Sequence, residues 1–189
     1  MISAFVDDKI KSLQIKTPWS TAMLAKLRRG IGKNPFEMPE LWEITLNGLP
    51  EELMAHDEEN PKPTESEWAI HTALTLYALH QQSNLYHVNE YKKSFATAVR
   101  RLISPDGSNE ESIKRRFDAI ITSNDLGELS YHARGAVQLM KSNQNISVDY
   151  PRFAKDLYAF QFPEGKARVR LQWGQDFYKL KYDENKDEV

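Results

Sequence analysis

One segment of the sequence, AIHTALTLYAL (residues 69–79), is apolar on nearly every face of the helix that it would form. A helix without a polar face has to be covered on all sides by other elements, so this one is central to the fold. Thr64 and Glu67 have the spacing of a capping box, which predicts that the helix spans about residues 65–85. Its histidines, His71 and His80, lie nine positions apart. Metal ligands on one helix need a spacing of three or four, so we predict that both histidines lie in the core or at its boundary.

A second unit, residues 108–141, is predicted to be a helical hairpin. Ser108 and Glu111 have capping-box spacing at its start, and Asp125 and Glu128 repeat that signal at the second helix. Each helix has one apolar stripe, formed by Ile113, Phe117, Ile120 and Ile121 in the first and by Leu126, Leu129, Ala133, Ala136 and Met140 in the second.

The opposite side of this hairpin is basic. At 100° per residue, Arg115 points away from the apolar stripe, and Lys114 and Arg116 flank it. Arg134 and Lys141 lie along one edge of the second stripe. The hairpin therefore has a hydrophobic inside and a basic outside.

The remaining segments are also predicted to be helical. Thr17 is typical of an N-cap before Pro18, and Gly30 and Gly32 end that helix. Short helical pieces are expected over 35–53, an exposed loop over 56–63, and further helices around residues 5–13, 95–103 and 150–160.

The last segment is ambiguous. Residues 167–173 alternate like a strand, but Val169, Trp173, Phe177 and Leu180 fit a longer helix. An isolated strand would have no partner, so we predict a helix.

The clearest break in the chain is SPDGSN, residues 104–109. We therefore predict an all-α protein of two small helical bundles packed side by side, an N-terminal one over 1–104 and a C-terminal one over 109–182. A disordered acidic tail, 183–189, follows.

Charge is distributed unevenly. Of the net charge of −2, the tail carries −3 and residues 51–67 carry −6, which leaves +7 on the rest of the chain. Four cations, Lys26, Arg28, Arg29 and Lys33, fall within eight residues that contain no acid. A helix C-terminus attracts cations through its dipole, but that explains two of them, so a binding role is a second interpretation.

No catalytic motif is present. The sequence has no phosphate-binding glycine loop, zinc-binding HExxH or nucleophile elbow, and it has no cysteine. Glu128 and His132 are four residues apart and could form half of a metal site, but a matching Glu-x-x-His on other helices is lacking. We predict a protein that is not an enzyme and has no cofactor. The N-terminus lacks a signal-peptide pattern, so we expect a cytoplasmic protein.

Five motifs resemble one family, the small subunit (CasB) of the type I-E CRISPR surveillance complex, Cascade. In order they are KLRRGIGKNP, PELWE, WAIHTALTLYALHQQ, RRFDAIITSNDLGELSYHARGAVQLMK and RLQWGQDFY, and the resemblance runs from about Pro18 to Tyr178. Ala133 stands where the family commonly has leucine before the Arg–Gly of the hairpin.

This resemblance implies a non-catalytic subunit, present in two copies, that bridges the large and backbone subunits. It also implies contact with crRNA and with the target and non-target DNA strands of the R-loop. Such contact needs only neutralisation of the phosphate backbone, because the guide RNA reads the sequence. The candidate residues are Lys26, Arg28, Arg29, Lys33, Arg100, Arg101, Lys114, Arg115, Arg116, Arg134 and Lys141.

Two other functions are compatible with the residues alone. The protein could be a helical scaffold or adaptor that contacts only protein, with its arginines in surface ion pairs. It could also be a hydrolase that uses Glu128 and His132.

Overall fold

The computed structural model describes residues 1–56, 59, 62–143 and 145–183, with residues 180–183 described by their backbone alone. The predicted all-α fold is confirmed, since this part of the chain contains helices, one isolated bridge between Asn89 and Val148, and no strand. The α-helices are α1 (Ile2–Gln14), α2 (Pro18–Arg29), α3 (Trp42–Thr45), α4 (Glu65–Gln81), α5 (Phe95–Arg100), α6 (Glu110–Thr122), α7 (Leu126–Ser142), α8 (Tyr150–Phe160) and α9 (Pro163–Asp183). Short 3-10 helices span Pro35–Glu37, Pro39–Leu41 and Glu51–Leu53.

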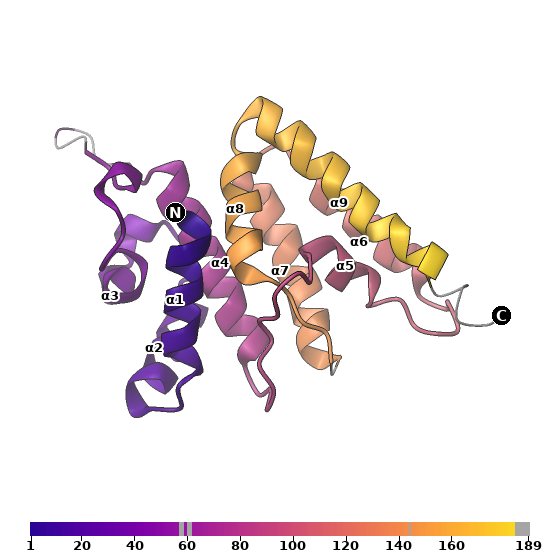
Figure 1. Cartoon of the computed structure of the whole chain (residues 1–189), viewed down its shortest axis with the longest axis horizontal. Coiled ribbons are helices and arrows are strands. Elements are labelled where there is room, and N and C mark those ends of the chain that lie inside the picture. The colour runs from indigo at the N-terminus through magenta and orange to yellow at the C-terminus, as the bar shows by residue number, and fades with distance from the viewer. Residues whose placement is uncertain (57–58, 60–61, 144, 184–189) are drawn as a thin grey trace.

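Helix α4 is at the centre of the fold, as the sequence predicts. It packs against α1, α2, α3, α7 and α8, and Figure 1 shows it between α1 and α8. Every residue from Ala69 to His80 is buried. The predicted capping box is present, because Thr64 Oγ1 accepts from the N–H of Glu67 at 3.1 Å and the Glu67 carboxylate accepts from the N–H of Thr64 at 2.7 Å.

The end of α4 was predicted too late. The helix stops at Gln81 rather than near Leu85, because Ser83 adopts a left-handed conformation with φ of 66°. The side-chain amide of Asn84 donates to the His80 carbonyl at 2.6 Å and so satisfies one group at the helix end. Leu85 follows in the loop with 95% of its surface exposed.

The predicted capping box at Ser108 is wrong. Asn109 occupies the N-cap position of α6, and its side chain makes no cap bond. The Asn109 side chain instead accepts from the N–H of Ser104 at 2.8 Å and donates to the Leu102 carbonyl, while the Ser108 hydroxyl donates to Asp106. Turn hydrogen bonds within 104–109 therefore take the side chains that would cap the helix.

The other predicted starts are confirmed. Thr17 caps α2 with Pro18 at the first helical position, and Asp125 caps α7 by accepting from the N–H of Glu128 at 2.8 Å. The final segment is helical, with Val169, Trp173 and Phe177 buried. The predicted loop over 56–63 and the tail over 183–189 lie largely outside the described residues.

The buried side chains form one cluster that extends from Ile2 to Phe177. Helix α5 precedes the predicted boundary at 104–109 and α9 follows it, yet these two helices pack together. Helix α8 similarly packs against α1 and α4. The division into two bundles stays a prediction.

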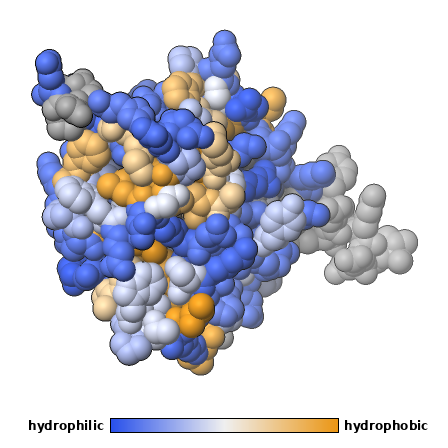
Figure 2. Space-filling view, turned by 60° about the vertical axis from the view of Figure 1, so that its left-hand side comes forward, coloured by the Kyte–Doolittle hydropathy of each residue, from blue (hydrophilic) through white to orange (hydrophobic). Residues whose placement is uncertain are grey.

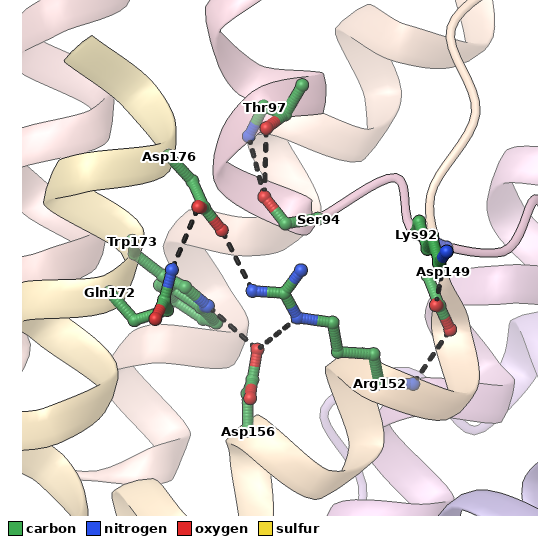
Figure 3. Close-up of polar contacts among 9 residues, drawn as sticks. All are labelled: Lys92, Ser94, Thr97, Asp149, Arg152, Asp156, Gln172, Trp173 and Asp176. Carbon is green, nitrogen blue, oxygen red and sulfur yellow. Dashed lines mark hydrogen bonds and ion pairs between the residues drawn. The ribbon is translucent and has the colours of Figure 1, made fainter. Parts of the chain in front are cut away.

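A polar network joins α8 to α9 (Figure 3). Arg152 donates to Asp176 at 2.9 Å, and the Trp173 indole donates to Asp156 at 2.9 Å. Burial raises the pKa of Asp156, which these two donors counter only in part. At the corner between the helices, a Cβ on Gly165 would overlap the carbonyl oxygen of Ala159, so only glycine allows this close approach.

In the described part of the chain, no helix combines the length and apolar character needed to cross a membrane.

Both histidines of α4 are in the core, as predicted. His71 is 1% exposed and His80 is fully buried, with its Nδ1 3.1 Å from the Tyr150 hydroxyl. Burial lowers the pKa of His80 from 6.5 to about 4. Between about pH 6.5 and pH 4, His80 is therefore protonated in the unfolded chain and neutral in the folded protein.

We predict that the protein loses stability between pH 6.5 and pH 4 partly through His80. At pH 5 the unfolded state binds this proton and the folded state does not, which lowers the free energy of unfolding by about 2 kcal/mol. Urea unfolding of wild type and of His80→Gln at pH 7.5 and 5.0 measures this contribution, because the variant loses less stability on acidification. The same substitution at the exposed His56 is the matched control for the loss of one histidine from the chain. An unchanged pH dependence in His80→Gln would show that His80 does not contribute.

Candidate nucleic-acid interface

The basic end of α2 is held in place by the turn that follows it. Gly30 ends the helix, and its carbonyl accepts a hydrogen bond from His71 Nε2 on α4 at 2.9 Å. A Cβ at Gly30 would lie 2.6 Å from Leu41 Cδ1, so glycine permits this close packing. Gly32 has a φ of 74°, the left-handed conformation that favours glycine. The turn therefore fixes Lys33 relative to α4.

The cations of this segment differ in exposure. Lys26 and Arg28 are half-buried, whereas Arg29 and Lys33 are exposed. Partial burial lowers the pKa of Arg28, and the neighbouring charge of Arg29 lowers it further. Among the described residues, none of these four cations forms an ion pair. This end of α2 therefore has positive charge that an anion would stabilise.

A pocket of about 600 Å³ brings distant cations together. It lies between the turn after α2, the start of α4, the first half of α7 and the α8–α9 corner. Lys33 and Arg134, which are predicted site residues, both line it, and so does Lys166. The other lining residues are Ile31, Gly32, Glu65, Trp68, His71, Thr72, Asn124, Asp125, Leu126, Gly127, Ser130, Tyr131, Phe160 and Gln161.

A second, shallower hollow of about 280 Å³ lies between α6 and α7. Arg115 and Arg116 line it together with His132. The His132 ring is 5.3 Å from the ring of Tyr131, which lines the larger pocket, so both hollows border α7. We call the cations along these hollows the α7 strip, which consists of Lys33, Arg134, Lys166, Arg115 and Arg116.

Three other predicted site residues interact with side chains of the same chain. Arg100 is 3.4 Å from Glu110, lies 5.8 Å from the centre of the Phe177 ring, and has a side chain only 12% exposed. Arg100, which we expected to contact phosphate, is therefore shielded from solvent by α6 and α9. Lys114 pairs with Glu110 at 2.9 Å, and Lys141 donates to Gln82 at 2.9 Å. Arg101, at the end of α5, is exposed.

Sequence reasoning missed Lys166 and Tyr131. Lys166 is far from the α6–α7 hairpin in sequence and reaches the pocket only because α9 turns back at Gly165, where the Lys166 amine donates to the Asn124 carbonyl. Tyr131 had a sequence signal, since it precedes Arg134 by three positions and therefore lies beside it on the helix. It is 75% exposed.

The Glu128 and His132 pair has another structural use. The Glu128 carboxylate accepts from the N–H of Asn124 at 2.7 Å and so caps the start of α7. His132 lies against Tyr131. Within the described ranges, no group of three His, Cys, Asp or Glu side chains is placed to hold a metal ion.

The chain is similar to known proteins over most of its length. Residues 23–178 match the sequence model of a family described as CRISPR-associated protein Cse2. The crystal structure of CasB from Thermobifida fusca is 31% identical, with a TM-score of 0.74 over 94% of this chain and 97% of that chain. CasB from M. ruber is 25% identical, with a TM-score of 0.69 over 96% of this chain and 98% of that one.

A chain of a CRISPR RNA-guided surveillance complex is 17% identical, with a TM-score of 0.71 over 97% of this chain and 99% of that one, a likeness of fold alone. None of the curated protein sequences compared with this chain matches it.

We predict that Arg115→Ala separates binding from stability. Arg115 is exposed and forms no ion pair among the described residues, so its removal should change the free energy of unfolding by less than about 0.5 kcal/mol. It should nevertheless weaken binding to single-stranded DNA, measured by fluorescence anisotropy. Ile120→Ala, on the buried face of the same helix, should cost about 2–5 kcal/mol through the cavity that it leaves.

Lys11→Ala is the control for charge. Lys11 is on α1, which borders neither hollow, so this variant removes one positive charge outside the α7 strip. Equal loss of affinity in Lys11→Ala and Arg115→Ala would contradict a localised interface.

Proposed function

The chain belongs to the Cse2 family of CRISPR-associated proteins, and from that premise we propose that it is the small, non-catalytic subunit of a type I-E Cascade complex. In this role two copies bridge the large subunit and the crRNA-bearing backbone subunits in the cytoplasm. They hold the target strand and the displaced non-target strand of the R-loop. The resemblance found in the sequence and the family match agree, and both cover most of the chain.

The observation that carries the nucleic-acid part of this proposal is the α7 strip. Cations from positions 33, 115, 116, 134 and 166 line two hollows that both border α7. Cations gathered in hollows on both sides of one helix fit a phosphate backbone, because each phosphate gains an opposite charge while the bases need no specific contact. Lys26, Arg28, Arg29 and Arg101 add positive charge elsewhere on the surface.

The three cations that interact with other side chains, Arg100, Lys114 and Lys141, have a different role in this proposal. Arg100, Lys114 and Lys141 already interact with Glu110 or Gln82, so contact with a phosphate would require breaking those interactions. We therefore assign Lys114 and Lys141 to the edge of the interface and Arg100 to the support of α6 against α9.

A second observation favours a protein partner near the segment around α3. Figure 2 shows the molecule with the left-hand part of Figure 1 turned toward the viewer. Hydrophobic residues gather in the upper half of this face, and hydrophilic residues surround them. Leu46, Leu53 and Met54, from the segment around α3, are only partly buried. Gathered hydrophobic residues on a surface are typical of contacts with other proteins. We propose that this face meets a neighbouring subunit.

We predict that the isolated chain binds single-stranded DNA in a strongly salt-dependent way and without sequence preference. Each phosphate contact releases a counterion, so the logarithm of the binding constant should fall by roughly 0.7 per contact for each tenfold rise in salt. Anisotropy titrations of several unrelated oligonucleotides between low and moderate salt measure this slope. Replacing Arg115, Arg116 and Arg134 together by neutral residues should make the dependence on salt shallower, by the amount that about two to three phosphate contacts contribute. An affinity independent of salt would contradict the electrostatic proposal.

We also predict that the chain joins a type I-E complex assembled from the other subunits and a crRNA. In co-purification, wild type and the triple arginine variant should both enter the complex, because assembly uses the protein-facing surface. The variant complex should hold an R-loop less stably. Failure of the wild-type chain to enter the complex would contradict the assignment to Cascade.

A further inference from the structure

The larger pocket has aromatic walls that phosphate binding alone does not require. Tyr131 stands exposed at its edge, while Trp68 is partly buried and Phe160 is fully buried. Its volume of about 600 Å³ lies within the roughly 300–1,000 Å³ typical of sites for small organic ligands. The pocket is therefore suited to a flat, partly apolar group.

The pocket also has cations. Lys33, Arg134 and Lys166 line it from three different parts of the chain. Lys166 lies 5.1 Å from the centre of the Phe160 ring, which places positive charge directly beside the aromatic wall. Of the two acids in the lining, Asp125 is occupied as the cap of α7. A ligand that combines a flat ring with a negative charge matches this lining better than a purely apolar one does.

His71 adds a buried acceptor. Its Nε2 lies 2.9 Å from the Gly30 carbonyl, and because a carbonyl can only accept, Nε2 carries the proton. Nδ1 is then an unprotonated acceptor, and it is buried without a partner among the described residues. Burial lowers the pKa of His71, which keeps the ring neutral. The His71 ring therefore adds uncharged surface to the lining of the pocket.

We propose that this pocket receives one unstacked nucleobase of a bound single strand. Tyr131 stacks on the base, and Lys33, Arg134 and Lys166 neutralise the adjoining phosphates. This inference rests on the proposed function and narrows it, because a base can enter the pocket only when it is unpaired and out of the stack. The chain then prefers single strands to duplex, even though its charges would attract both.

The test compares two oligonucleotides of equal length and charge, one with ordinary bases and one made wholly of abasic residues. Both present the same phosphates, so any difference in affinity for the full-length chain reports on the bases. We expect the base-bearing strand to bind about tenfold more tightly, since stacking on one aromatic side chain is worth roughly 1–3 kcal/mol. Tyr131→Ala should lose that advantage and keep its affinity for the abasic strand. Tyr131→Phe should retain most of the advantage, because the ring remains.

Tyr131 is exposed, so Tyr131→Ala should melt at the wild-type temperature, which is checked by circular dichroism. Equal, salt-dependent binding of both strands by the wild-type chain would overturn the base pocket and leave the proposed function intact. The absence of salt-dependent binding to either strand would overturn both. Loss of complex assembly in Tyr131→Ala, with both strands bound equally, would assign the pocket to a protein side chain instead.

Discussion

The fold depends on the burial of α4 on all its sides. A helix without a polar face is stable in water only when its neighbours cover it, so α1, α2, α7 and α8 have to assemble around it together. This requirement also brings the basic segments close to one another. The end of α2 is tied to α4 through His71 and Gly30, and α7 packs on another part of the same helix. Packing of the core thereby positions Lys33 and Arg134 around one pocket.

Local signals in the sequence predicted most of the helices, because apolar periodicity and N-caps act within a few residues of each other. The caps at Thr17, Thr64 and Asp125 illustrate this. The failures occur where two local interactions compete. At Ser108, turn hydrogen bonds within 104–109 replaced the expected cap, and at Ser83 a left-handed residue ended α4 early. Neither competition is visible in residue spacing alone.

The candidate interface was less predictable than the fold. Helical geometry places Arg115 on an exposed face, and that placement needs only one helix. The shielding of Arg100 depends on α6 and α9, which come from later parts of the sequence. Lys166 likewise joins Arg134 only through the packing of α9 near α7. Charge in a sequence therefore indicates how many cations are available, while tertiary packing decides which of them remain accessible.

The corner at Gly165 has a consequence for how members of such a family can diverge. The α8–α9 backbones touch at Ala159 without room for a methyl group, and the neighbouring Gln161 and Lys166 form one wall of the larger pocket. One wall of that pocket is therefore positioned by a close contact between main chains. Replacing surface cations would change the attraction for anions gradually. A larger residue at position 165 would instead displace the α8–α9 corner and change the shape of the larger pocket in a single step. The positive charge of this surface can change one residue at a time, but the shape of the pocket depends on the absence of a side chain at position 165.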